Sequence, residues 1–114
     1  MFNKANKNFI GYNNPKVKRE ATYYLAYSFR YHGQSDSALV YFKKCIDFEK
    51  QLNLDEETGF AVNSTLYSGT IKEAQGKYSE AKKYYEKVLD MDEYGNSHDL
   101  AESYLENLEK RKKN

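Results

Sequence analysis

The chain has 114 residues, of which 39% are hydrophobic and 31% are charged, and this composition fits one domain of ordinary size. Its formal net charge of +1 argues against a protein built around contacts to nucleic-acid phosphates. No apolar run is long enough for membrane insertion, and the single cysteine excludes an internal disulfide framework. The cysteine content favours a cytoplasmic protein, with an extracytoplasmic sensor domain as the alternative.

Five helices are predicted in chain order, and almost no strand pattern competes with them. The first follows Pro15 and stops at Gly33, and the second is capped by Ser35 or Asp36 and extends to Leu52. The third ends near Gly76. The fourth starts around residues 79–81, and the last starts at residue 96 or 97.

Each predicted helix carries apolar residues at helical spacing, which indicates the face that it buries. The stripe of the first helix is Val17, Ala21, Leu25, Ser28 and Phe29. The next is Ala38, Leu39, Phe42, Cys45, Ile46 and Leu52. The third and fourth helices carry Val62, Leu66, Gly69 and Ile71, then Tyr78, Ala81, Tyr85, Val88 and Leu89. The last helix has a single stripe, which is Leu100, Ala101, Tyr104, Leu105 and Leu108.

A stretch of sequence occurs twice at a constant offset of 43 residues. Tyr24, Ala26, Gly33, Ala38, Tyr41, Phe42, Lys44, Cys45 and Ile46 recur in order as Tyr67, Gly69, Gly76, Ala81, Tyr84, Tyr85, Lys87, Val88 and Leu89. A period of this size is typical of repeat architectures, in which one unit cannot bury its apolar face alone. Function in such proteins lies on a surface formed by stacked units.

These repeated positions resemble the tetratricopeptide repeat, a helix–turn–helix unit of about 34 residues. The family pattern places a small residue in the first helix (Ala26, Gly69), a glycine at the turn (Gly33, Gly76), and then an alanine and an aromatic in the second helix (Ala38 and Phe42, Ala81 and Tyr85). The bulky residue early in the first helix is replaced by Thr22 and Thr65, and no proline closes either unit. The longer spacing is similar to the 40–43-residue repeats of bacterial regulatory and sensor proteins.

The resemblance implies an all-α fold in which helix–turn–helix units stack as a short right-handed α-solenoid with a C-terminal capping helix. The units expected are residues 15–54 and 55–95, followed by the capping helix and basic tail over residues 96–114. Residues 1–14 are either the end of a preceding repeat or a flexible leader, because Phe2 and Ala5 match Phe42 and Cys45 at an offset of 40. In the first case the chain is a fragment of a longer array.

The resemblance also implies a concave groove, lined by the first helix of each unit, that holds a partner peptide. In this sequence the groove residues are Glu20, Tyr23, Tyr27, Arg30, Tyr31, Asn63, Leu66, Thr70 and Glu73. Tyr23, Tyr27 and Tyr31 share one helix face, and such an aromatic groove suits an extended apolar peptide. The alternative is that these tyrosines pack against an N-terminal helix.

No motif in the sequence predicts catalysis or a cofactor. His32 and His98 lack a second ligand at metal spacing, and Cys45 occupies a small core position. The acidic loop from Asp90 resembles a calcium loop, but Tyr94 and Ala101 stand where oxygen donors are needed.

The expected function is therefore non-catalytic binding of a protein or peptide, as part of a regulatory or adaptor protein. The alternatives are self-association through an unpaired N-terminal face and an RNA-binding helical repeat, although nucleic acid is disfavoured by the charge balance.

Overall fold

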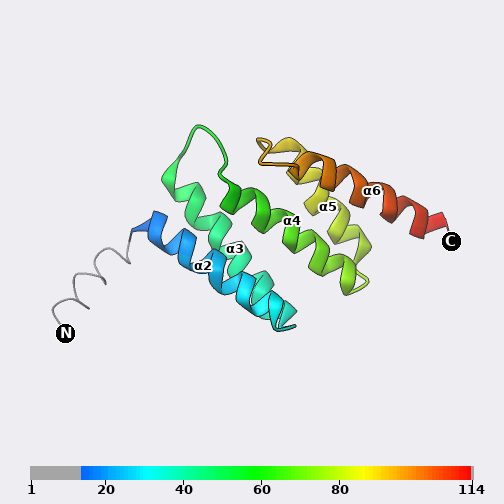
Figure 1. Cartoon of the computed structure of the whole chain (residues 1–114), viewed down its shortest axis with the longest axis horizontal. Helices are drawn as coiled ribbons and strands as arrows, with labels where there is room; N and C mark the ends of the chain where they lie inside the picture. The colour runs from blue at the N-terminus through cyan, green and yellow to red at the C-terminus, as the bar shows by residue number, and fades with distance from the viewer. Residues whose placement is uncertain (1–13, 114) are drawn as a thin grey trace. The chain divides into compact units, whose positions relative to one another are not determined.

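The computed structural model describes residues 14–113, and over that range every regular element is a helix (Figure 1). The helices are α2 (Pro15–Tyr31), α3 (Ser35–Leu52), α4 (Gly59–Ala74), α5 (Tyr78–Asp90) and α6 (Ser97–Lys113). The chain forms two compact units, Met1–Asp55 and Glu56–Asn114. In the first, α2 packs on α3, and in the second α5 packs on both α4 and α6. The predicted all-α class and the five predicted helices are confirmed.

Both helical hairpins turn at a glycine in the left-handed conformation. Gly33 and Gly76, 43 residues apart, each have φ of 77°. At the first turn the N–H groups of Gly33 and Gln34 donate to the carbonyls of Arg30 and Phe29, at 3.1 and 2.8 Å. The second turn repeats this pair of hydrogen bonds, which is the Schellman arrangement that closes a helix end. A side chain with a Cβ is strained at this φ, so glycine is favoured at both places.

The helix starts agree with the sequence at the first and last helices but not at the second. Asn14 caps α2 by accepting a hydrogen bond from the Lys16 N–H at 2.8 Å, with Pro15 at the first helical position. At α3 the N-cap is Gln34, whose side chain makes no cap hydrogen bond, so the expected cap at Ser35 or Asp36 is wrong by at least one position. The last helix begins at Ser97, as predicted.

The first unit buries a different face of α2 from the predicted one. Val17 and Leu25 of the predicted stripe are 38% and 42% exposed, whereas Arg19 and Ala26 are buried. The half-buried Tyr23 places its ring edge-on to Phe42, with 6.1 Å between centroids. The prediction failed because α2 is apolar on two sides, and the small Ala26 lets the Tyr23 side approach α3 most closely.

A buried ion pair is the second reason for this packing. The Arg19 Nη1 atom lies 3.1 Å from the Glu49 Oε1 atom, and the two side chains are only 5% and 7% exposed. Helix periodicity treats both residues as parts of solvated faces. Pairing instead allows charged groups to occupy the interior between α2 and α3.

The second unit has the larger apolar core, which contains most of the predicted stripe residues. Tyr78 of the predicted α5 stripe is 37% exposed, however, and α4 also buries Ser64 and Ser68, which lie outside its predicted stripe. Residues from α4, α5 and α6 form one cluster of Ala61, Val62, Leu66, Ala81, Tyr85, Val88, Met91, Ala101 and Leu108. The remaining apolar residues of α6, namely Leu100, Tyr104 and Leu105, pack against this cluster. The ends of α4 and α5 are tied together, because Glu57 and Asp92 each donate a backbone N–H to the other's carboxylate, at 2.9 and 3.2 Å.

Two expectations from the sequence stay predictions. The possible preceding repeat or leader falls on residues 1–13, which lie outside the described residues. Stacking of the two units as a right-handed solenoid is likewise an expectation from the family resemblance.

Candidate functional site

Four predicted binding residues on α2 form a surface that we call the tyrosine face: the exposed Tyr27, Arg30 and Tyr31 and the half-buried Glu20. Tyr27 is 45% exposed and Tyr31 is 80% exposed, and Arg30 is also exposed. At about 100° per residue, these side chains cluster on one side of α2. Exposed tyrosines in a row are notable because each offers a large apolar ring and a polar hydroxyl to a partner.

Tyr23 supports the tyrosine face more than it contributes surface to it. Its ring contacts Phe42 on one side and Tyr24 on the other, with centroid distances of 6.1 and 5.4 Å. Tyr24 itself is 63% exposed. At the C-terminal end of α2 the Tyr31 ring meets His32 edge-on at 5.5 Å, and the His32 Nδ1 atom lies 2.8 Å from the Ser28 carbonyl oxygen.

The predicted groove residues of the second unit do not form a comparable surface. Leu66 is 4% exposed and belongs to the core cluster, so it offers almost no area to a ligand. Asn63 and Thr70 are half-buried, and the Thr70 hydroxyl donates to the Tyr67 carbonyl at 2.8 Å. Glu73 contacts Tyr85 of α5 and Arg111 of α6.

Glu73 accepts a hydrogen bond from α5 and forms an ion pair with α6. The Tyr85 hydroxyl donates to the Glu73 Oε1 atom at 2.8 Å, and the Arg111 Nη2 atom lies 3.5 Å from the Glu73 Oε2 atom. The Arg111 guanidinium also lies over the Tyr78 ring, 5.7 Å from its centroid. Burial, together with the Glu73 carboxylate, raises the pKa of Tyr85 far above its ordinary value. The prediction of Glu73 as a groove residue is therefore not supported by its contacts.

The sequence itself carries a signal for this network. Tyr85 is matched in the first unit by Phe42, which has no hydroxyl, and Glu73 is matched by Arg30, which cannot accept a hydrogen bond. The hydroxyl and its acceptor thus occur together in one unit and are absent together from the other. Gly69, matched by Ala26, completes the set, because a Cβ at Gly69 would lie 2.5 Å from the Tyr85 Cε1 atom.

The histidines and the cysteine of the described residues are not gathered into a metal site. Within residues 14–113 no three His, Cys, Asp or Glu side chains are placed to hold a metal ion. The His98 Nε2 atom lies 2.8 Å from the Met91 carbonyl oxygen, and Cys45 is buried. Hydrogen bonds from the side chain and backbone of Glu57 lower the pKa of Asp92, an exposed structural contact and not a pocket. Over the same residues no helix is both long and apolar enough to cross a membrane.

Comparison with known proteins identifies both hairpins. Two family models, each described as tetratricopeptide repeat, match the chain at residues 20–48 and 68–94. The first match covers most of α2 and α3, and the second covers the end of α4 and all of α5. No curated protein and no solved structure matched the chain.

Proposed function

The chain belongs to the tetratricopeptide repeat family, and we propose that it is a non-catalytic binding module whose tyrosine face receives an extended apolar segment of a partner protein. Repeats of this family generally act as scaffolds for protein–protein interaction. The observation that supports the proposed site is the exposure of Tyr27 and Tyr31 on one side of α2. Large aromatic side chains are the residues that most often dominate the binding energy of protein interfaces.

The chemistry of the tyrosine face favours an extended peptide with apolar side chains. The rings present flat apolar surfaces, and their hydroxyls can donate to or accept from a peptide backbone. Arg30 and the half-buried Glu20 stand at opposite ends of this surface with opposite charges. Neither sign dominates, so a strongly acidic or strongly basic ligand gains little there.

An RNA partner is less well supported by the contacts in the structure. The basic run at the end of α6 begins with Lys110 and Arg111, and Arg111 pairs with Glu73 and Tyr78 of its own chain. A guanidinium that neutralises an internal carboxylate contributes less to phosphate binding than one held in solvent.

The experiment that tests the proposal is a selection from a phage-displayed library of random linear peptides, using the whole chain as bait. The selected peptide is then titrated against wild type and against the double variant Tyr27→Ala, Tyr31→Ala. Loss of one hot-spot residue weakens binding by about 30-fold, and removing two aromatic contacts is expected to weaken it by at least that much. Helicity, measured by circular dichroism, is expected to stay unchanged because both rings are exposed.

The matched control is Tyr94→Ala, which removes a 54% exposed tyrosine from the second unit. It is expected to leave the affinity unchanged. Equal binding by wild type and the double variant, or an equal loss from the control, would overturn the proposed site.

A further inference from the structure

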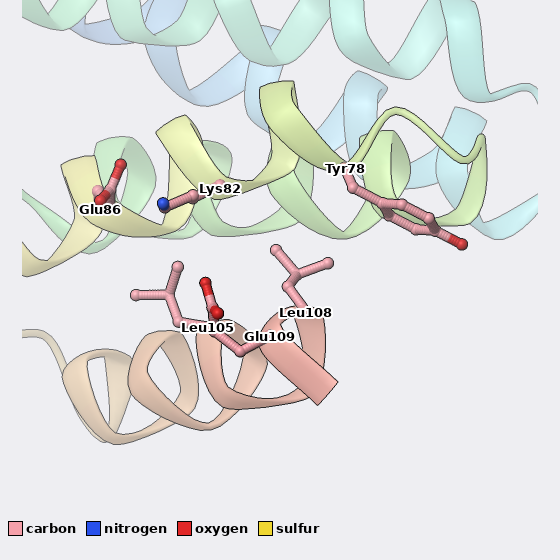
Figure 2. A pocket seen from close by; sticks show the side chains of 6 residues that line it. All are labelled: Tyr78, Lys82, Glu86, Leu105, Leu108 and Glu109. Atoms are coloured by element: carbon pink, nitrogen blue, oxygen red, sulfur yellow. The ribbon is translucent and has the colours of Figure 1, made fainter. Parts of the chain in front are cut away.

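A small pocket opens between α5 and α6 in the second unit (Figure 2). It has a volume of about 180 Å³ and is lined by Tyr78, Lys82, Glu86, Leu105, Leu108 and Glu109. Cavities of about 150 Å³ hold one benzene ring, whereas pockets for whole small molecules span about 300–1,000 Å³. The pocket therefore suits one side chain of a protein partner and not a cofactor.

The walls of the pocket combine an apolar floor with acidic residues on both sides. Leu105 and Leu108 point from α6 toward α5, and Leu108 is 4% exposed (Figure 2). Glu86 stands on the α5 wall and Glu109 on the α6 wall, and both are exposed. Lys82 lies on the α5 wall, one helical turn before Glu86. An aliphatic side chain that carries a cation on each side would meet the leucines and both glutamates.

The start of α2 presents a side chain of that description. Val17 is 38% exposed and lies on the outer side of α2, away from the buried Arg19 and Ala26. Lys16 and Lys18 flank it in sequence and so point to opposite sides of it, about 200° apart around the helix. Lys16 is exposed, and the Lys18 Nζ atom lies over the Phe48 ring at 5.6 Å.

The charges of the two units favour the same pairing. Residues 1–55 contain nine Lys and Arg against five Asp and Glu, whereas residues 56–114 contain nine against twelve. The first unit thus has a formal charge of +4 and the second a charge of −3. Complementary charge of this kind orients two approaching proteins and raises their rate of association.

We propose that the α5–α6 pocket binds a second copy of this chain, with Val17 of the second copy in the pocket and its Lys16 and Lys18 beside Glu86 and Glu109. The contact joins different surfaces of the two copies, so it is heterologous and can repeat into chains of copies. It does not use Tyr27 or Tyr31, although Lys16 and Val17 lie one helical turn from Glu20, so the contact adjoins the N-terminal end of the tyrosine face. One apolar anchor and two exposed ion pairs make a weak contact that salt weakens further.

The experiment is sedimentation velocity of the full chain from about 10 μM to about 1 mM, the range in which a weak contact becomes populated. Wild type is expected to show a sedimentation coefficient that rises with concentration and falls when salt is added. Two double variants place like charges at the contact. One changes α2 (Lys16→Glu together with Lys18→Glu), and the other changes the pocket (Glu86→Lys together with Glu109→Lys). Each is expected to weaken association by about tenfold or more.

Mixing the two charge-reversed variants is the decisive arm. The acidic α2 of one variant then faces the basic pocket of the other, so association is expected to return in the mixture although each variant alone stays monomeric. Lys82→Glu, which removes the one cation from the pocket wall, is expected to strengthen association of the otherwise wild-type chain.

Two matched controls change charge elsewhere. The double variant Lys44→Glu with Lys50→Glu changes the net charge of the first unit by the same amount as the α2 variant. Like Lys18→Glu, its Lys44→Glu substitution removes a lysine that lies over an aromatic ring. Glu102→Lys, Glu106→Lys alters exposed positions of α6 outside the pocket. Both are expected to associate much more like wild type than the contact variants do. A wild type that is monomeric at every concentration, a mixture that does not recover, or equal loss from the controls would overturn the proposal.

Discussion

Gly69→Ala is the substitution on which two physical effects of opposite sign compete most clearly. Gly69 lies inside α4, where replacing glycine with alanine ordinarily stabilises a helix by about 1 kcal/mol. The added Cβ, however, would lie 2.5 Å from the Cε1 atom and 2.8 Å from the Cδ1 atom of Tyr85. The outcome depends on whether the Tyr85 ring can move away.

The structure indicates that the ring cannot move cheaply. Tyr85 is fully buried in the core cluster, and its hydroxyl is held by Glu73 at 2.8 Å. Overpacking a core costs about 1–3 kcal/mol, and losing a hydrogen bond to a charged group costs about 1.5–3 kcal/mol. These costs exceed the gain in helix propensity. We expect Gly69→Ala to lower the free energy of unfolding by about 1–3 kcal/mol.

Gly59→Ala is the matched control because its Cβ would meet the Tyr94 ring at nearly the same distance, 2.7 Å. Tyr94 is 54% exposed and can rotate into solvent, so this variant is expected to be close to neutral. Urea denaturation followed by circular dichroism gives both free energies. A Gly69→Ala protein as stable as wild type, or equal losses from the two variants, would refute the argument that an anchored ring sets the cost.

Three further predictions concern buried polar groups. Glu49→Gln removes the ionised Glu49 carboxylate that pairs with the buried Arg19. It is expected to lower the free energy of unfolding, measured by urea denaturation, by about 3–5 kcal/mol. A loss under about 1 kcal/mol would contradict the burial of this ion pair. Ser64→Ala removes a fully buried hydroxyl, whose Oγ atom has no hydrogen-bond partner among residues 14–113. The substitution is expected to raise the free energy of unfolding by about 1 kcal/mol, and a lower melting temperature would contradict this. Because the pKa of Tyr85 is raised on folding, its contribution to stability is complete below about pH 10 and is lost as the pH rises further. Tyr85→Phe is therefore expected to make the decline in stability above about pH 10 shallower by up to about 1.4 kcal/mol per pH unit. An unchanged slope in Tyr85→Phe would contradict the assignment.

The sequence predicted the helices and turns well because their signals are local. Gly33 and Gly76 end their helices through a backbone conformation that only the residues near the turn determine. The stripes of α5 and α6 were largely correct, because their predicted residues other than Tyr78 belong to the core cluster or pack against it. The stripe of α4 was not, because that helix buries residues on all sides, including Ser64 and Ser68.

The packing of α2 could not be predicted in the same way. Its sequence has apolar residues on two sides, and periodicity alone favoured the side of Val17 and Leu25. The side that packs on α3 includes Arg19, whose burial depends on Glu49, 30 residues away in the sequence. A pairing across that distance leaves no trace in the periodicity of either helix.

The candidate site stays a prediction, and its two halves differ in how much surface they expose. Tyr27 and Tyr31 are exposed, as a binding face on α2 requires. Leu66 and Glu73 were assigned by matching positions between units, but that match ignores the hydroxyl of Tyr85, which draws Glu73 toward α5. The differences between the repeats, and not their shared residues, hold the information about this network.

The proposal that α2 binds a partner is tested most directly by nuclear magnetic resonance. A ¹⁵N-labelled chain is titrated with the peptide selected on the whole protein, and the amide shifts are followed residue by residue. We expect the largest shifts at Tyr27, Arg30 and Tyr31, with α5 and α6 little affected. Shifts confined to the second unit, with the amides of α2 unchanged at saturation, would contradict the account.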